Sequence, residues 1–281
     1  MLASLTARPP DRLTAQSSLS IASLSGSTRS AGLAGAGVAI MGDAGAIFIN
    51  PAGLATVHRT ALEGSYEASP GGTSVSSAAA AVRLGRLDYG IGGRTVHLPV
   101  TTTGTDVLAV SALVYRLGMI AVGTSLKYVR EGAAVPIEEA WAGDAGLAIA
   151  LFDIFALGAS VQNIGGNVGG GGHLLPRLTR VGFTMNFVDP QGTARLLTTL
   201  EGQWPEGQKA VIVAGAEGGI VTHGVGMIAR LGVSGGSSSR DLSPIAAGAG
   251  VAFGRLQFDY AYRSFDTAGG ALHRFGVRWG H

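Results

Sequence analysis

The fold is decided by stretches of alternating side chains, of which residues 256–263, reading LQFDYAYR, are one. One row of this stretch is bulky and apolar: Leu256, Phe258, Tyr260 and Tyr262. The other row is polar or small: Gln257, Asp259, Ala261 and Arg263. Successive side chains of a β-strand point to opposite faces, so a period of two indicates a strand between two different surroundings.

The same alternation recurs from residue 57 to the end of the chain, in runs of about ten residues separated by Gly, Pro, Asp or Asn. We expect strands at residues 57–68, 73–84, 86–97, 105–116, 118–130, 140–150, 154–163, 175–187, 193–204, 208–218, 221–234, 244–254, 256–265 and 271–280. Single-chain bacterial barrels have an even number of strands. The sequence therefore predicts an all-β fold, a membrane-spanning antiparallel up-and-down β-barrel of about 14 strands over residues 57–281.

Composition favours lipid as the surroundings of the apolar row. Hydrophobic residues make up 46% of the 281 residues, charged residues 14%, and the mean hydropathy is +0.34, which is high for a soluble protein. No run of eighteen uninterrupted apolar residues offers a spanning helix. A soluble sandwich would alternate in the same way. Short turns and aromatic residues near strand ends favour the membrane: Trp141, Trp204, Tyr260, Tyr262 and Trp279.

The opposite row would line the lumen of the barrel. Charges of both signs fall on it, and the candidate site residues among them are Glu63, Arg83, Lys127, Asp144, Glu201, Glu217, Arg230, Asp259, Arg263 and Arg274. Asp88, Arg94, Arg195 and Arg278 share this row. They form either a functional track or an inner wall that is solvated and pairs with an inserted segment, and we favour the second interpretation. Glycines are also frequent on this row: Gly146, Gly158, Gly182, Gly226, Gly232, Gly248, Gly250 and Gly276. Glycine weakens a strand unless something must approach closely, so a segment inside a narrow lumen is predicted.

The inserted segment is expected at residues 26–56, a hatch whose core, residues 29–55, reads RSAGLAGAGVAIMGDAGAIFINPAGLA. Asp43 is predicted to cap a short helical turn at residues 44–49, which Asn50-Pro51 would end. If Asp43 is buried, it needs this capping role or an arginine partner from the wall. Residues 1–25 form a separate N-terminal segment, either the remnant of a signal region or disordered.

The hatch resembles that of the FadL-like outer-membrane proteins, and more closely that of the PorV/PorQ group. The matching positions are Arg29, Gly35, Gly37, Asp43, Asn50, Pro51, Ala52, Gly53 and Leu54. Later blocks that look like those of the group lie at residues 158–165, 175–177, 229–233, 258–262 and 273–275. The resemblance covers nearly the whole chain after residue 25. The chain departs from the group in being short, with reduced loops.

The resemblance implies a non-enzymatic protein of the outer membrane of a diderm (Gram-negative) bacterium that binds or passes hydrophobic small molecules. Its implied partners are outer-membrane lipids, the barrel-assembly machinery during biogenesis, and a hydrophobic ligand. An alternative is an accessory of a type IX-like protein-secretion system, which holds exported cargo beside a secretion translocon; the reduced loops argue against it. A purely structural barrel within a surface assembly is the third interpretation.

Other functional classes find no support in the sequence. Cysteine is absent, and the six histidines are scattered without ligand spacing or a neighbouring nucleophile, so no catalytic residue, metal or cofactor is predicted. Gly35-Ala-Gly37 lacks the preceding strand of a dinucleotide-binding unit. A net charge of +2 without a dense basic run gives no basis for nucleic-acid binding. Residues 1–20 lack an apolar signal core, and we hypothesise that residues 13–15 end a signal peptide whose start lies upstream.

Overall fold

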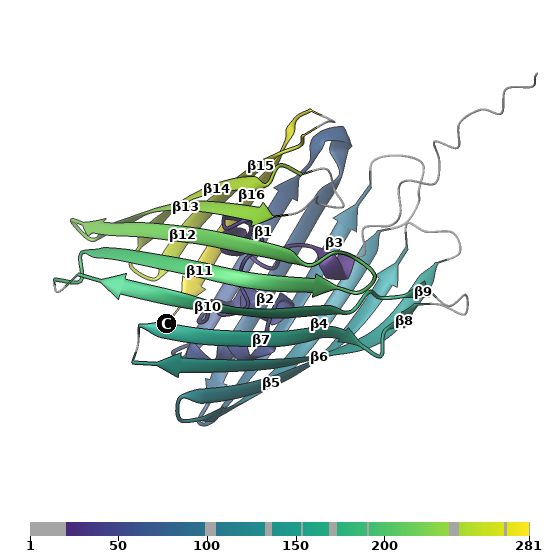
Figure 1. Ribbon diagram of the computed structural model, residues 1–281, viewed down its shortest axis with the longest axis horizontal. Coiled ribbons are helices and arrows are strands. Elements are labelled where there is room, and N and C mark those ends of the chain that lie inside the picture. The colour runs from purple at the N-terminus through teal and green to yellow at the C-terminus, as the bar shows by residue number, and fades with distance from the viewer. Residues whose placement is uncertain are drawn as a thin grey trace, which may run out of the picture.

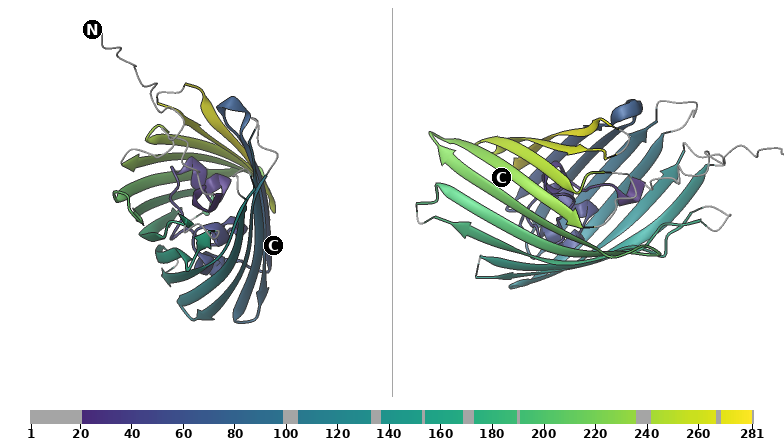
Figure 2. Two further views of the ribbon diagram at one scale, coloured as in Figure 1. Left: turned by 90° about the vertical axis from the view of Figure 1, so that its right-hand side faces the viewer. Right: turned by 45° about the horizontal axis from the view of Figure 1, so that its top comes forward.

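A computed structural model describes residues 21–98, 105–132, 137–152, 154–168, 173–189, 191–235, 242–266 and 269–280. Fourteen antiparallel strands close into one barrel, in which β1 pairs with β16 (Figures 1 and 2). The barrel strands are β1 Thr60–Ala68, β2 Ser74–Leu84, β3 Leu87–His97, β4 Asp106–Leu117, β5 Ile120–Glu131, β6 Glu138–Leu151, β7 Phe155–Ile164, β10 Leu178–Val188, β11 Ala194–Pro205, β12 Val211–Thr222, β13 Val225–Gly235, β14 Ile245–Phe253, β15 Leu256–Ser264 and β16 Ala271–Gly280. The predicted fold class and strand number are confirmed. Among the described residues, no helix is long and apolar enough to cross a membrane.

The two ends of the barrel differ in their connections. Two-residue turns join β2 to β3, β4 to β5, β12 to β13 and β14 to β15, and each contains a glycine with positive φ: Gly85, Gly118, Gly224 and Gly254. Such turns match the twist of paired strands. We call this the short-turn end; β1 starts and β16 finishes here. The opposite, long-loop end carries the 3-10 turn η4 (Pro70–Gly72) and the longest described connection, between β7 and β10.

The wall separates an apolar outer face from a buried inner face, as the alternation predicts. On β15 the exposed fractions of Phe258 and Tyr262 are 47% and 41%, whereas Asp259 and Ala261 between them are each 4% exposed. The outer face carries many more large apolar side chains that are about half exposed, such as Val122, Val181 and Trp141. Lipid would cover this surface in a membrane-spanning barrel.

Residues 21–56, which we call the inner segment, lie inside the barrel (purple in Figure 2). The inner segment contains η1 (Ile21–Ser23), α1 (Thr28–Gly32), η2 (Ala44–Phe48) and η3 (Pro51–Thr56). Most of its apolar side chains are buried, with Ile21, Leu33, Ile47 and Leu54 fully so. Residues 21–25 are part of it, ahead of the position 26 expected from the sequence, while residues 1–20 lie outside the described residues.

Inward glycines let the inner segment touch the backbone of the wall. A Cβ atom added to Gly123 would lie 2.6 Å from the Ala52 nitrogen, and one on Gly158 would collide with the Val38 carbonyl. Gly232 and Gly276 face Leu33 and Thr28 in the same way. Among the glycines predicted to make such room, Gly226 and Gly250 instead have only atoms of the wall nearby. The small inward row therefore matches the path of the inner segment, except at these two positions.

The connection between β7 and β10 is more ordered than a loop. It contains a small two-stranded sheet that the sequence does not predict, β8 (Asn167–Val168) with β9 (His173–Leu174). Residues 169–172 lie outside the described residues. Leu175, just after β9, is 3% exposed and belongs to the same hydrophobic cluster as Ile21 and Leu24. This connection therefore contributes Leu175 to the hydrophobic interior that the inner segment also fills.

Candidate functional site

The candidate site is the contact between the inner segment and the barrel wall. Short helices leave many backbone N–H and C=O groups without partners, and buried groups need partners. Asn50 meets this need at one point: its side-chain oxygen accepts from Ala52 N at 3.1 Å, and its amide donates to the carbonyls of Val38 (2.7 Å) and Leu147 (3.1 Å). Pro51 occupies the first position of η3, where no N–H is required. The Asn-Pro pair thus ties two parts of the inner segment to β6.

The rest of the predicted hatch motif packs around this point. Gly53 accepts from Gly42 N at 2.9 Å, and a Cβ on Gly53 would lie 2.8 Å from that of Ala46. Leu54 is fully buried and faces Gly90 of β3, where an added Cβ would lie 2.6 Å from Leu54 Cδ1. Small residues are therefore needed here for close packing.

The glycine-rich turn at residues 35–38 is held by two charged side chains. Gly35 has a φ of +96°, a conformation that favours glycine. The carboxylate of Glu201 accepts from the backbone N of Gly37 and of Val38, both at 2.8 Å. Arg180 pairs with Glu201 at 2.9 Å and donates to Gly35 O at 3.1 Å. Side chains of β10 and β11 therefore hold the turn through hydrogen bonds to its backbone.

The block at residues 158–165 holds the middle of the inner segment. Ser160 donates to Ile49 O at 2.9 Å, and Gln162 donates to Phe48 O at 2.8 Å. Asn163 has a φ of +60°, and the register between β6 and β7 shifts beside it. Bulges of this kind re-aim side chains. The block that resembles the PorV/PorQ group is thus a set of hydrogen bonds to the inner segment followed by a bulge.

Two arginines hold the first described residues. Arg94 donates to Ser25 O at 2.9 Å, and its guanidinium lies 4.6 Å from the centre of the Phe48 ring. Arg274 donates to Ser25 O at 3.0 Å and to Gly26 O at 3.2 Å. Each arginine bridges several carbonyls, which suits the fixed fork of donors on a guanidinium.

A closed ring of ion pairs joins the inner segment to four strands. We call this set the ion-pair ring; its members, in order, are Arg29, Glu217, Arg230, Asp259, Arg278 and Asp43. Arg29 binds both oxygens of Glu217, at 2.8 and 2.7 Å, and reaches Asp43 at 3.0 Å. Arg230 lies 2.6 Å from both Glu217 and Asp259. Arg278 completes the ring, 2.7 Å from Asp259 and bonded to Asp43.

The ring corrects the expected role of Asp43. Asp43 stands before η2, but its side chain makes no capping hydrogen bond. Both carboxylate oxygens are occupied by Arg29 and Arg278, so the arginine partner is the role that the structure shows. Burial alone would raise the pKa of Asp43, yet Arg278 and Arg29 hold that pKa below its usual range. Arg195, whose side chain is 41% exposed, adds a further pair to Glu217.

The remaining predicted wall residues divide into two groups. Glu63 accepts from Gly45 N at 2.9 Å, and Arg83 donates to Ala55 O at 2.8 Å, so both touch the inner segment. Lys127 and Asp144 form a buried pair within the wall at 2.8 Å. Arg263 binds Ser243 O and Ser234 Oγ toward the long-loop end. These last three residues belong to the wall rather than to the contact with the inner segment.

Sequence reasoning missed several contact residues. Arg180, Ser160, Gln162 and Thr184, which donates to Ala39 O at 3.1 Å, were not candidates. Arg180 and Thr184 flank Gly182 at a spacing of two, so the inward alternation carried the signal. Alternation does not reveal where in the lumen each carbonyl of the inner segment lies or which way it points, so these contacts could not be predicted. Among the described residues, no group of three or more metal-ligating side chains is present.

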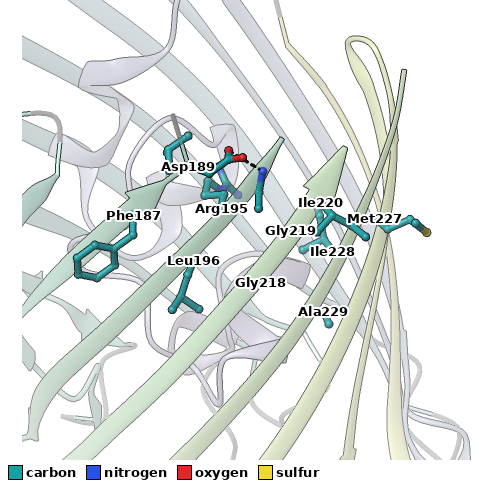
Figure 3. A pocket seen from close by; sticks show the side chains of 12 residues that line it. Phe187, Asp189, Arg195, Leu196, Gly218, Gly219, Ile220, Met227, Ile228 and Ala229 are labelled. Carbon is teal, nitrogen blue, oxygen red and sulfur yellow. Dashed lines mark hydrogen bonds between the residues drawn. The ribbon is translucent and has the colours of Figure 1, made fainter. Parts of the chain in front are cut away.

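A groove of about 690 Å³ lies on the outer face of β10 to β13, near the short-turn end (Figure 3). Its sides are Phe187, Leu196, Ile220 and Met227, which are between 44% and 51% exposed, and its floor includes Gly218 and Ala229. These side chains belong to the outward row, while Arg195, which pairs with Glu217 of the lumen, also lines the groove. Every neighbouring pair of described barrel strands is hydrogen-bonded around the whole wall.

Comparison with known proteins supports the fold. No protein-family model matches the chain, and no curated protein matches it. The Ralstonia pickettii toluene transporter TbuX matches with a TM-score of 0.60 at 14% identity, over 92% of this chain and 99% of that one. The monoaromatic hydrocarbon channel CymD gives 0.61 at 13% identity, over 91% and 97%. A Pseudomonas aeruginosa FadL homologue gives 0.60 at 12% identity, over 90% and 98%. The chain therefore has the fold of the FadL-like transporter barrels.

Proposed function

We propose that the protein is a non-enzymatic outer-membrane barrel of Gram-negative bacteria that passes hydrophobic small molecules, with the inner segment acting as its hatch. The observation that carries this proposal is a segment of short helices that fills a closed 14-strand barrel and is held by noncovalent polar contacts. The apolar outer face supports placement in lipid. The fold likeness to barrels described as toluene and monoaromatic hydrocarbon transporters supports an apolar cargo.

The inner segment has one stretch suited to move first. Met41, Gly42 and Asp43 are only partly buried, whereas residues 44–55 beyond them are buried. Gly42 has a φ of +92°, and Asp43 is held to the wall through Arg278 of β16. A shift of this stretch breaks the ion pairs of Asp43 without removing the apolar residues of η2 and η3 from their cluster. We therefore place the start of hatch opening here.

A reversible crosslink tests whether the inner segment must move. A Cβ added to Gly215 would lie 3.2 Å from that of Leu33, a little under the roughly 3.5–4.5 Å between the Cβ atoms of a disulfide. The chain has no cysteine of its own. We expect the variant Leu33→Cys/Gly215→Cys to take up toluene into cells when reduced and to lose most of this uptake when oxidised. Each single-cysteine variant should respond to neither treatment. Equal uptake in both states would contradict a hatch in which the part of the inner segment around Leu33 must move.

A purely structural barrel is the second candidate, because the described wall is continuous and the inner segment is bonded along its length. It predicts no protein-dependent uptake by the unmodified chain or by either state of the cysteine variant. The accessory role in protein secretion draws no support from the described residues or from the structures compared above. The PorV/PorQ subtype stays a prediction from the hatch motif and the later blocks.

A further inference from the structure

A second groove lies on the outer face, on the opposite part of the wall from the one in Figure 3. This groove, which we call the β1 groove, has a volume of about 600 Å³ and crosses β16, β1, β2 and β3. Its sides are Leu62, Ile91, Val277 and Trp279, between 37% and 50% exposed. Its floor is formed by Gly64, Ala78 and Gly93. The β1 groove is thus an apolar groove facing lipid, with small residues at its floor and large residues at its sides.

The register of the strands explains the β1 groove. Gly64 is paired with Ala78 on one side and with Val277 on the other, and Ala78 is paired with Gly93, so the small residues form one row across the strands. An added Cβ on Gly64 would meet nothing within 4 Å, so no neighbouring side chain covers the floor. Barrel strands tilt by about 40°, so a groove across them descends obliquely into the membrane.

Basic residues gather at the short-turn end beside this groove. Arg59, Arg86 and Arg255 are exposed, and none of them makes a side-chain hydrogen bond or an ion pair within the described residues. Arg255 O accepts from the N of Gly280, the residue after Trp279. Arg59 O accepts from Arg83 N, at the foot of β2. The three arginines therefore stand at one end of β15, β16, β1 and β2, so that they span at least three strand spacings of about 5 Å each.

The acids of the adjoining strands are bonded to other groups: Glu63 of β1 accepts from Gly45 N. Asp88 is fully buried and pairs with Arg83 and Arg116, at 3.2 and 2.8 Å. Asp189 lies at the end of β10, across the barrel. Among the described residues, the exposed charge beside the β1 groove is thus positive, and it sits where the short-turn end would meet the membrane surface.

We propose that the β1 groove and the three arginines bind an anionic glycerophospholipid from the leaflet at the short-turn end. One acyl chain lies along Gly64 and Ala78 between Leu62 and Trp279, and the phosphate lies among Arg59, Arg86 and Arg255. Guanidinium groups suit phosphate because they donate bidentate, charge-assisted hydrogen bonds. This inference rests on the membrane placement proposed above and is independent of whether the inner segment moves.

Fluorescence quenching of Trp279 tests the site. A Trp141→Phe/Trp204→Phe variant leaves Trp279 as the one tryptophan, since the chain has three. It is reconstituted with phosphatidylglycerol or phosphatidylcholine brominated on the acyl chains. We expect the brominated phosphatidylglycerol to associate about fivefold or more in preference, an effect of the size that basic residues near anionic lipid produce. Replacing the three arginines, as Arg59→Gln/Arg86→Gln/Arg255→Gln, should remove the preference.

Two controls separate the site from general charge attraction. Gly64→Leu fills the groove from its open outer side and should reduce quenching of Trp279 by both lipids. A matched variant that keeps only Trp141, on β6, should show no preference between the lipids. Equal quenching of Trp279 by both lipids, or a preference that survives the triple arginine variant, would overturn the site. An unchanged result for Gly64→Leu would overturn the groove as the acyl-chain position. No quenching by either lipid would instead overturn the membrane placement.

Discussion

At the scale of single residues, the buried charges of the lumen are paired in a closed sequence of contacts. Glu217 is fully buried and receives bonds from Arg29, Arg230 and Arg195. Bringing such charges out of water is expensive, and the ion pairs offset that loss only while each charge keeps its partners. The intact ring therefore adds little to the free energy of unfolding. Removal of one member leaves its partners buried without a counter-charge, and the desolvation of these partners is then no longer offset.

Glu217→Gln is the residue-scale prediction. It leaves Arg29 and Arg230 without their shared carboxylate, and we expect the free energy of unfolding to fall by about 3–5 kcal/mol. Urea unfolding in lipid vesicles measures this change. Glu139→Gln is the matched control, because Glu139 forms an exposed pair with Arg130 at 3.5 Å and its loss should cost under about 1 kcal/mol. Similar losses in both variants would contradict a special role for the ring.

At the scale of elements, strands were predictable and their partners inside the barrel were not. All fourteen strands follow from alternation, and the largest boundary difference, four residues, is at the turn between β12 and β13, where β12 runs to Thr222. Alternation is a local property of the chain, which a sequence displays directly. The contact of Glu201 with Gly37 joins positions 164 residues apart and depends on how the whole barrel closes. The capping role expected for Asp43 was wrong for the same reason, since local preference gave way to distant arginines.

Inward and outward glycines should behave differently, which is the prediction at the element scale. A Cβ on Gly232 of β13 would collide with the Leu33 backbone, whereas a Cβ on Gly218 of β12 would meet nothing within 4 Å. We expect Gly232→Ala to displace α1 and to lower the free energy of unfolding by about 1–3 kcal/mol. Gly218→Ala should change it by less than about 0.5 kcal/mol. Limited proteolysis of the inner segment provides a second measurement, with faster cleavage expected for Gly232→Ala alone.

At the scale of the whole molecule, the barrel and the inner segment share their hydrophobic interior. The largest buried cluster includes Ile47, Phe48 and Leu54 of the inner segment together with Val110 and Val114 of β4. A 14-strand wall encloses more space than its own side chains fill, because barrel diameter grows with strand number. The lumen is therefore a packed core while the inner segment occupies it, and it would become a channel if the inner segment moved out.

Leakage through the barrel is the prediction at this scale. Asn50→Ala/Pro51→Ala removes the cap of η3 and leaves the carbonyls of Val38 and Leu147 without that donor. We expect small solutes to pass through the reconstituted variant several times faster than through the unmodified protein, because each unpaired buried group costs about 1–3 kcal/mol and loosens the hatch. Single-channel conductance in planar bilayers measures this passage. Conductance equal to that of the unmodified protein would show that Asn50 and Pro51 do not hold the hatch shut.

The place of the inner segment in the chain has a consequence for biogenesis. η3 ends at Thr56, and β1 begins at Thr60. The barrel closes when β16 pairs with β1. Threading residues 21–56 through a finished cylinder would drag a folded, glycine-fitted backbone past side chains that leave no clearance for it. A simpler route is for the strands to assemble around residues 21–56, which precede β1 in the chain. Pairing of β16 with β1 then closes the barrel around the inner segment. A substitution that misfolds the inner segment would therefore prevent the barrel from closing.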